Sequence, residues 1–396
     1  MAKDRLARSA VSFDSFLIFS VMNRTFWIDL IRVVGAFLVV AIHVSGRVAG
    51  GYAVGENSEV VGTLGWLVSL SICSLSSSVA VPLFVMVSGA LLLGRNEETI
   101  PFYRKRFGKI LLPFLGWSCI FILCLWLAGR GFKDGTPITV ITALGAFLSG
   151  GISGHFWFMY MLISLYLVAP FLSVLVRNAS KTMLTCFLVL WFIAIVIFPV
   201  VENVAKATLG ITAIAENFRF ELVSLWVGFF VAGYVLKDVL ISKRWAVIAL
   251  VIWFCFAMTS PLNSYYLRIA HADSSMTFLC ISMGKYVIPI ISHQVTLALI
   301  AFLVLRSLGD IPSPSSSPFG RMIIIAAPLT FGVYLCHHLV LTPTMEILDR
   351  ILGLGSTGSW LVVLCAIPIL TTFFFVVSAG AVYLLRRSRY LKFLVP

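Results

Sequence analysis

Long apolar runs recur along this chain, and they limit its fold more than any other feature. Of its 396 residues, 60% are hydrophobic and only 11% are charged, whereas soluble domains carry about 25% charged residues. Runs of 18 or more apolar residues are long enough to cross a bilayer, and a helix satisfies its backbone hydrogen bonds there without water. The sequence therefore predicts an all-α, polytopic helical membrane protein.

The runs predict ten transmembrane helices and one membrane domain over residues 26–385, preceded by an extension (1–25) and followed by a basic tail (386–396). The apolar segment 138–150 is too short to cross, and we expect it to lie in the interface or to re-enter the membrane. The predicted spans cover 27–47, 63–93, 110–128, 155–175, 182–201, 219–236, 245–261, 276–305, 322–343 and 359–385.

Positive charges are distributed unequally between the two sides of these spans. Of the 29 Lys and Arg residues, twenty fall on the side of the N-terminus and seven on the other, while Arg32 and Lys285 lie inside spans. The positive-inside rule then places both termini in the cytoplasm. The net charge of +13 is thus explained by topology, and we expect no nucleic-acid partner.

Cysteine usage gives no sign of a disulfide framework or a metal site. All eight cysteines lie inside apolar runs, and none forms a CxxC pair. Cysteines in such positions are typical of small core residues. We therefore expect no metal.

The first predicted span carries Asp29, Arg32 and His43, three ionisable residues in an otherwise apolar helix. Eleven residues separate Arg32 from His43, which is close to three helical turns, so both side chains share one face about 16 Å apart along the axis. Ionisable groups at membrane depth normally face a polar cavity and mark a functional site. The alternative is an ordinary first helix with an Asp29–Arg32 ion pair at one interface and His43 at the other.

With the N-terminus inside, Arg32 lies toward the cytoplasm and His43 toward the outer surface. This arrangement suggests a slot for a long anionic donor from the cytoplasm, with its phosphates near Arg32. The basic loop that opens the third span, with Arg104, Arg106 and Lys109, lies on the same side and is a second candidate for phosphate binding. The alternative is that these charges only set topology. At the other end of the slot, the imidazole of His43 can accept the proton of a hydroxyl while that hydroxyl attacks a thioester.

Two further charged residues are candidates for the same cavity. Glu221, at the start of the sixth span, is the best-placed acid to orient His43, because Asp29 lies too far along the helix. Lys285 and His293 are eight residues apart, so they share a helix face. They line the cavity or pair within the bundle.

The remaining histidines are less informative. His155 stands beside Trp157 at the start of the fourth span, a pattern typical of an interfacial anchor. His337 and His338 are adjacent and should face different sides of their helix. We expect one of the two to reach the cavity.

Five segments, in chain order, resemble motifs of the membrane-bound acyltransferase-3 family. In that family Arg-x10-His is followed by a Pro-Leu-Phe-Phe run ending in Ser-Gly, an Arg-x-x-Arg segment, a Trp-x-Leu…Tyr-Leu…Pro stretch and a late Tyr-Leu-x-His. Here Lys109 replaces the second Arg of the third motif. The matching segments are Asp29–Arg32 with His43, Val81–Gly89, Phe102–Pro113, Trp157–Pro170 and Tyr334–His337.

The resemblance implies an O-acyltransferase of the bacterial inner membrane. It would take an acyl group, usually acetyl from acetyl-CoA, and transfer it to a hydroxyl of a surface carbohydrate or lipid-linked glycan beside membrane lipid. It implies His43 as the catalytic histidine and Arg32 with Arg106 as donor-site residues. The absence of an appended domain predicts the short form found among O-antigen and exopolysaccharide acyltransferases. We expect the cavity to be lined further by Asp29, Ser88, Trp157, Lys285 and His337.

Two other functions are compatible with the pattern. A glycolipid transporter or flippase would use His43 and Lys285 as coupling or substrate residues, and a non-catalytic subunit of a polysaccharide exporter would use neither. The sequence leaves open the choice between acetyl and succinyl groups. It also leaves open whether His43 acts as a general base or carries the acyl group covalently.

Overall fold

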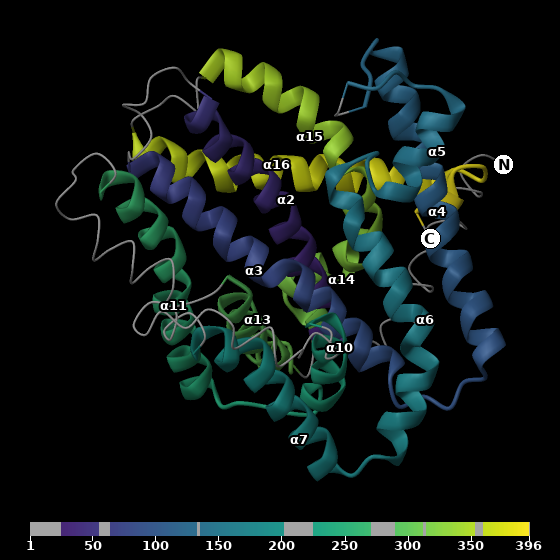
Figure 1. Cartoon of the computed structure of the whole chain (residues 1–396), viewed down its shortest axis with the longest axis vertical. Helices are drawn as coiled ribbons and strands as arrows, with labels where there is room; N and C mark the ends of the chain where they lie inside the picture. Colours follow the sequence, from purple (N-terminus) through teal and green to yellow (C-terminus); the bar gives the residue numbers. More distant parts are fainter. Residues whose placement is uncertain are drawn as a thin grey trace.

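A computed structural model describes residues 25–54, 64–132, 135–201, 225–270, 290–311, 314–352 and 359–395, and every regular element in them is helical (Figure 1). The longer helices are α2 (Phe26–Val54), α3 (Leu64–Leu92), α4 (Thr99–Leu127), α5 (Val140–Ser149), α6 (Trp157–Asn178), α7 (Lys181–Phe192), α10 (Leu225–Leu236), α11 (Lys243–Ala270), α13 (Ile290–Leu308), α14 (Pro318–Ala326), α15 (Thr330–Leu352) and α16 (Trp360–Arg387). Short turns of helix include η1 (Gly154–Phe156), η5 (Ala327–Leu329) and η6 (Lys392–Leu394).

Helix α2 lies at the centre of the bundle. It runs alongside α3 and also contacts α13, α14, α15 and α16 (Figure 1). The side chains of Ile31, Val40 and Val44 are fully buried, and the indole of Trp27 meets the ring of Phe302 edge-on with ring centres 5.9 Å apart. Because protein surrounds α2, its polar residues face other helices or a cavity rather than lipid.

Glycines allow α3 and α10 to approach each other closely. A Cβ atom on Gly89 would lie 1.8 Å from the carbonyl oxygen of Phe230, and one on Gly233 would lie 1.9 Å from that of Met86. Since backbone occupies both places, neither glycine can be enlarged without separating the helices. Small residues are typical of helix contacts inside a bilayer, where lipid tails are as apolar as the side chains.

Seven helical segments in the described ranges are long and apolar enough to cross a membrane, which confirms the multi-pass prediction. The three other predicted spans coincide with α10, α11 and α13, and the segments before α10 and α13 lie outside the described ranges. The count of ten and the side of the termini therefore stay predictions. The seven segments are Phe26–Ala49, Leu64–Leu92, Thr99–Leu127, Gly154–Asn178, Lys181–Val201, Pro318–Leu348 and Trp360–Arg387.

The predicted interfacial segment forms the short helix α5. Its N-terminus is capped reciprocally, because the Thr139 side chain accepts from the backbone N–H of Thr142 at 3.2 Å and the Thr142 hydroxyl oxygen accepts from that of Thr139 at 2.8 Å. One face of the helix is apolar and open, with side chains between 58% and 86% exposed. An amphipathic helix of this kind suits a membrane interface. The exposed residues are Val140, Ile141, Leu144 and Leu148.

The last residues of the chain pack against α4. Leu394 of η6 and Val395 are buried, and the indole N–H of Trp117 donates to the carbonyl oxygen of Leu394 at 3.0 Å. The end of the predicted basic tail is thus attached to the bundle. The predicted N-terminal extension, apart from Thr25, lies outside the described residues.

We predict that Gly89→Leu destabilises the protein by about 2 kcal/mol or more, since overpacking a close helix contact costs about 1–3 kcal/mol. Size-exclusion chromatography after heating in detergent measures the loss. Gly108→Leu is the matched control, because no atom lies within 4 Å of a Cβ placed on that helical glycine. Equal apparent melting temperatures for the two variants would contradict the close approach of α3 and α10.

Candidate active site

Four histidines from three segments of the chain form one cluster. His43 comes from α2, His155 from η1, and His337 and His338 from α15. The ring centre of His43 lies 4.2 Å from that of His338, 5.2 Å from that of His337 and 6.4 Å from that of His155. The structure therefore brings both adjacent histidines of α15 to His43, whereas the sequence predicted only one at the cavity.

The hydrogen bonds of His337 determine which ring nitrogen carries the proton. Its Nδ1 lies 2.7 Å from the carbonyl oxygen of Tyr334 and 3.1 Å from that of Val333. A carbonyl oxygen only accepts, so Nδ1 donates and the lone pair of a neutral ring is at Nε2. That Nε2 atom is buried and has no hydrogen-bond partner in the described part of the chain.

The rings of His155 and His338 each have a hydroxyl partner at Nδ1. His155 Nδ1 lies 2.8 Å from the Ser153 hydroxyl, and His338 Nδ1 lies 3.4 Å from the Thr342 hydroxyl. The Nε2 atoms of both rings are buried without a hydrogen-bond partner among the described residues. Because a buried polar atom left unpaired costs about 1–3 kcal/mol, several of them in one place indicate a site for a ligand.

A cavity of about 460 Å³ lies further toward the start of α2. Four cations from three helices, Arg32, Arg106, Lys109 and Arg386, are among the residues that line it. Apolar and hydroxyl-bearing side chains complete the wall, including those of Ser88, Phe84, Phe158, Leu162, Tyr166 and Tyr334. Such a cavity suits a molecule with an anionic end and an apolar end.

Local contacts hold two of the cations at the cavity. Arg106 lies 3.7 Å from a carboxylate oxygen of Glu97, and its guanidinium stands 5.6 Å from the ring centre of Phe102. The Nε atom of Arg106 is buried without a hydrogen-bond partner in the described ranges. Arg386 donates to the carbonyl oxygen of Pro328 at 3.1 Å. Arg106 therefore retains a donor that no acceptor in the described part of the chain uses.

Three aromatic rings connect the cavity to the histidine cluster. Phe84 and Phe158 have ring centres 6.1 Å apart, and Phe158 and Tyr334 have theirs 5.2 Å apart. The Tyr334 hydroxyl donates to the carbonyl oxygen of His155, and its ring lies 6.3 Å from that of His337. These three residues, which we call the aromatic wall, line the cavity on one side and reach the histidines on the other.

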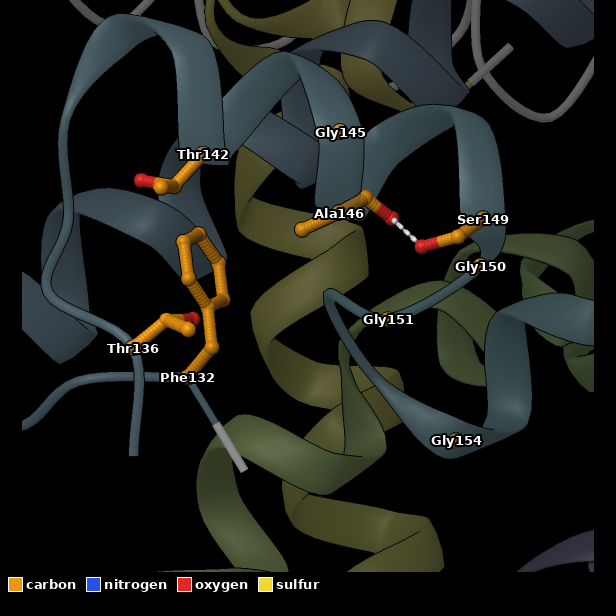
Figure 2. A pocket seen from close by; sticks show the side chains of 9 residues that line it. All are labelled: Phe132, Thr136, Thr142, Gly145, Ala146, Ser149, Gly150, Gly151 and Gly154. Atoms are coloured by element: carbon orange, nitrogen blue, oxygen red, sulfur yellow. Dashed lines mark hydrogen bonds between the residues drawn. The ribbon is translucent and has the colours of Figure 1, made fainter. Parts of the chain in front are cut away.

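A second hollow, of about 430 Å³, lies beneath α5 (Figure 2). The ring of Phe132 points toward Thr142, and Ser149 donates to the carbonyl oxygen of Ala146 at 3.5 Å (Figure 2). Its lining is neutral, with one aromatic ring, small residues and hydroxyl groups. The lining residues are Phe132, Thr136, Thr142, Gly145, Ala146, Ser149, Gly150, Gly151 and Gly154.

This hollow lies at the same end of α2 as His43. Gly154, in its lining, directly precedes His155 of the cluster. Arg130, close to Phe132 in the chain, lies 3.4 Å from Glu346, which in turn lies 3.6 Å from Arg47, one turn beyond His43. The histidine cluster therefore has the cationic cavity on one side and the neutral hollow on the other.

Three other predicted site residues fall outside the cavity lining. Asp29 is buried, with 2% of its surface exposed. Arg104 is exposed and does not line the cavity. Trp157 is 46% exposed and packs on Trp226 with ring centres 5.7 Å apart. The remaining two predictions, Glu221 and Lys285, lie outside the described residues.

Sequence reasoning missed His155 and the joint role of the two histidines in α15. His155 is only 3% exposed, and its ring stacks on that of His338 with centres 4.5 Å apart. The neighbouring Trp157 suggested an interfacial anchor, but other aromatic rings, those of Phe121, Phe156 and Tyr334, pack around the imidazole. Its one available signal was a histidine at the start of an apolar run.

A family model described as an acyltransferase domain matches residues 25–384. By class, the protein is a membrane-embedded acyltransferase. The chain belongs to the acyltransferase-3 family, and the resemblance found in its motifs is confirmed. No curated protein and no solved structure matches the chain.

We predict that Tyr334→Phe lowers the free energy of unfolding by about 1 kcal/mol or more, because it leaves the buried His155 carbonyl without this donor. The matched control is Tyr103→Phe, which removes an exposed bond from the Tyr103 hydroxyl to the carbonyl oxygen of Leu167. Thermal unfolding in detergent should give a clearly lower apparent melting temperature for Tyr334→Phe alone. Equal shifts would contradict a structural role for this bond.

Proposed function

We propose that the protein transfers an acetyl or related acyl group from acyl-CoA to a hydroxyl of a cell-surface carbohydrate or lipid-linked glycan, with His43 as general base. The observation that carries this proposal is the arrangement along α2. A cavity with cations from three helices and a cluster of imidazoles lie on either side of the aromatic wall. This arrangement suits a phosphorylated donor whose reactive end must reach a base.

Charge and size favour a coenzyme A thioester as the donor. Coenzyme A carries several phosphate charges at one end and its thioester at the other. Guanidinium groups bind phosphate through paired hydrogen bonds, while the ammonium of Lys109 acts as a compact point charge. The cavity volume of about 460 Å³ lies within the range of about 300–1,000 Å³ typical of ligand pockets. An extended donor would continue from the cations toward His43.

Acyl transfer at His43 would follow general base catalysis. The imidazole accepts the proton of the acceptor hydroxyl while that oxygen attacks the thioester carbonyl carbon. The carbon–sulfur bond then breaks, and the leaving coenzyme A sulfur takes the proton from the imidazolium. His337 and His338, with ring centres within 5.2 Å of that of His43, hold the reacting ring in place.

The neutral hollow beneath α5 offers an approach for the acceptor. Its hydroxyl groups and exposed glycine backbone suit a sugar, and Phe132 offers a ring face on which a sugar can stack. The open apolar face of α5 would lie against membrane lipid, so a lipid-linked glycan could keep its lipid in the bilayer. In the predicted topology this end of α2 faces away from the cytoplasm of a bacterial inner membrane.

The proposal is tested by acyl transfer with purified protein in nanodiscs. Radiolabelled acetyl-CoA or succinyl-CoA is supplied with an extract of lipid-linked glycans, and wild type is compared with His43→Ala and Arg32→Ala. We expect label in glycan, no transfer with His43→Ala, and recovery of Arg32→Ala at high donor concentration. If neither donor supports transfer while cells carrying His43→Ala still modify their glycans, the enzymatic function is excluded and transport becomes the leading alternative.

We predict that Arg106→Ala raises the KM for acyl-CoA about tenfold with a smaller effect on kcat, since a lost charged hydrogen bond costs about 1.5–3 kcal/mol. Arg104→Ala removes the same charge two residues away, outside the cavity, and should leave the KM within about twofold. Initial rates over a range of donor concentrations measure both values. A similar rise for both variants would indicate a general effect of loop charge rather than binding in the cavity.

We predict that Gly145→Phe raises the KM for the glycan acceptor and leaves the KM for acyl-CoA unchanged. No atom lies within 4 Å of a Cβ placed on Gly145, which lines the hollow, so a large side chain there has room to enter it. Gly380→Phe is the control, because that helical glycine in α16 also has open space around it and does not line the hollow. Acceptor kinetics unchanged by Gly145→Phe would place the acceptor elsewhere.

A further inference from the structure

We propose that His43, His337 and His338 together form a binding site for a divalent transition-metal ion of the zinc class. One nitrogen of each ring can be chosen so that all three atoms lie within 4.8 Å of one another. The ring centres are 4.2, 5.0 and 5.2 Å apart. Imidazoles bound to one tetrahedral zinc ion, with Zn–N bonds of about 2.0–2.1 Å, have ring centres about 5 Å apart.

The donor set restricts the kind of ion. Three imidazoles suit zinc, cobalt, nickel or copper, whereas calcium and magnesium require oxygen ligands. No Asp or Glu from the described part of the chain belongs to this group of ligands. A bound ion would keep its double charge, and its fourth position would stay open for water, hydroxide or another anion.

Hydrogen bonds on the far side of two rings orient them for coordination. His337 donates from Nδ1 to backbone carbonyl oxygens, and His338 Nδ1 lies 3.4 Å from the Thr342 hydroxyl. Metal-bound histidines almost always use their second nitrogen in this way. In both rings the buried Nε2 atom has no hydrogen-bond partner among the described residues. A metal ion would take up these lone pairs.

His155 supports the site without joining it. Its ring is parallel to that of His338, with 1° between the planes and 4.5 Å between the centres. Nitrogens at the edges of two stacked rings cannot both point at an ion between the three other rings. The site therefore has three protein ligands, and His155 packs against one of them.

The charged groups at this end of α2 include two arginines and one glutamate. Arg47 lies one turn beyond His43 on α2. It lies 3.6 Å from Glu346, and Arg130 lies 3.4 Å from the same carboxylate. Glu346 thus offsets part of the positive charge at this end of α2.

The ion would compete with the proposed base. Metal and proton need the same lone pair of His43, so an occupied site cannot accept a proton from a hydroxyl. The metal-bound protein is then an inhibited form. Metal binding itself depends only on the three rings, so it can be tested whether or not the proposed acyl transfer is correct.

The experiment is a Co²⁺ titration of the full chain, purified through a tag without histidine, treated with a chelator and dialysed. Cobalt in a site with three nitrogen ligands gives visible absorption bands, which report binding without any activity measurement. We expect one Co²⁺ per chain, displaced by Zn²⁺, which binds such sites more tightly. Absence of the bands in folded wild-type protein would overturn the proposal.

Variants identify the ligands. His337→Asn and His338→Asn should each weaken Co²⁺ binding by at least about tenfold, because each removes one of three ligands. His338→Cys should keep binding and add a sulfur-to-cobalt charge-transfer band, which a merely structural role would not produce. Cys73→Ala is the control, since that thiol lies 3.7 Å from the carbonyl oxygen of Ile42 beside the site, and its removal should change nothing.

Folding is checked for each variant by size-exclusion chromatography. If the Asn variants do not fold, the spectrum of His338→Cys decides the question. A folded His338→Cys protein without the charge-transfer band would overturn the proposal. So would wild-type binding that survives intact in folded His337→Asn and His338→Asn.

Discussion

Polar groups are costly inside a bundle of apolar helices, and this cost controls how the protein is arranged around α2. Each ionisable side chain of that helix needs a partner, a cavity or another polar side chain. Arg32 reaches a cavity that it shares with cations from α4 and α16, and His43 reaches three other imidazoles. Helix α2 is central because its polar residues must be covered by protein.

The aromatic wall lies between the cationic cavity and the histidine cluster and connects the two. Phe84, Phe158 and Tyr334 contact the cationic cavity and, through Tyr334, hold the carbonyl of His155. Acyl transfer as proposed requires a thioester to pass between the cations and His43 along these rings. The fixed position of Tyr334 therefore connects the packing of the bundle to the geometry of the histidines.

The lone pair of His43 is required by both proposals. Acyl transfer uses His43 as a base, and metal binding uses the lone pairs of His43, His337 and His338 together. The two uses exclude each other at any moment, so they describe two states of one site. The family match establishes an acyltransferase, and the proposals add what donor, acceptor and ion its residues suit.

The sequence predicted much of this fold, because the length and apolarity of a segment decide by themselves whether it can cross a bilayer. It also predicted that Arg32 and His43 share a helix, and that the segment around residue 140 is too short to cross the membrane, since both depend on spacing and length within one segment. The resemblance to the acyltransferase-3 family also came from local information, because each motif lies within one short segment. The sequence did not predict the neighbours of each site residue, because these neighbours come from segments that are distant in the chain.

Only the tertiary structure decided which residues meet. It placed Arg106 and Lys109 at the cavity and left Arg104 outside, although all three charges lie within two turns of one helix. It brought His155 from a loop before α6 and both histidines of α15 to His43, which no spacing in the sequence indicates. A single helix fixes the face on which a side chain lies, but the packing of neighbouring helices determines what that face meets.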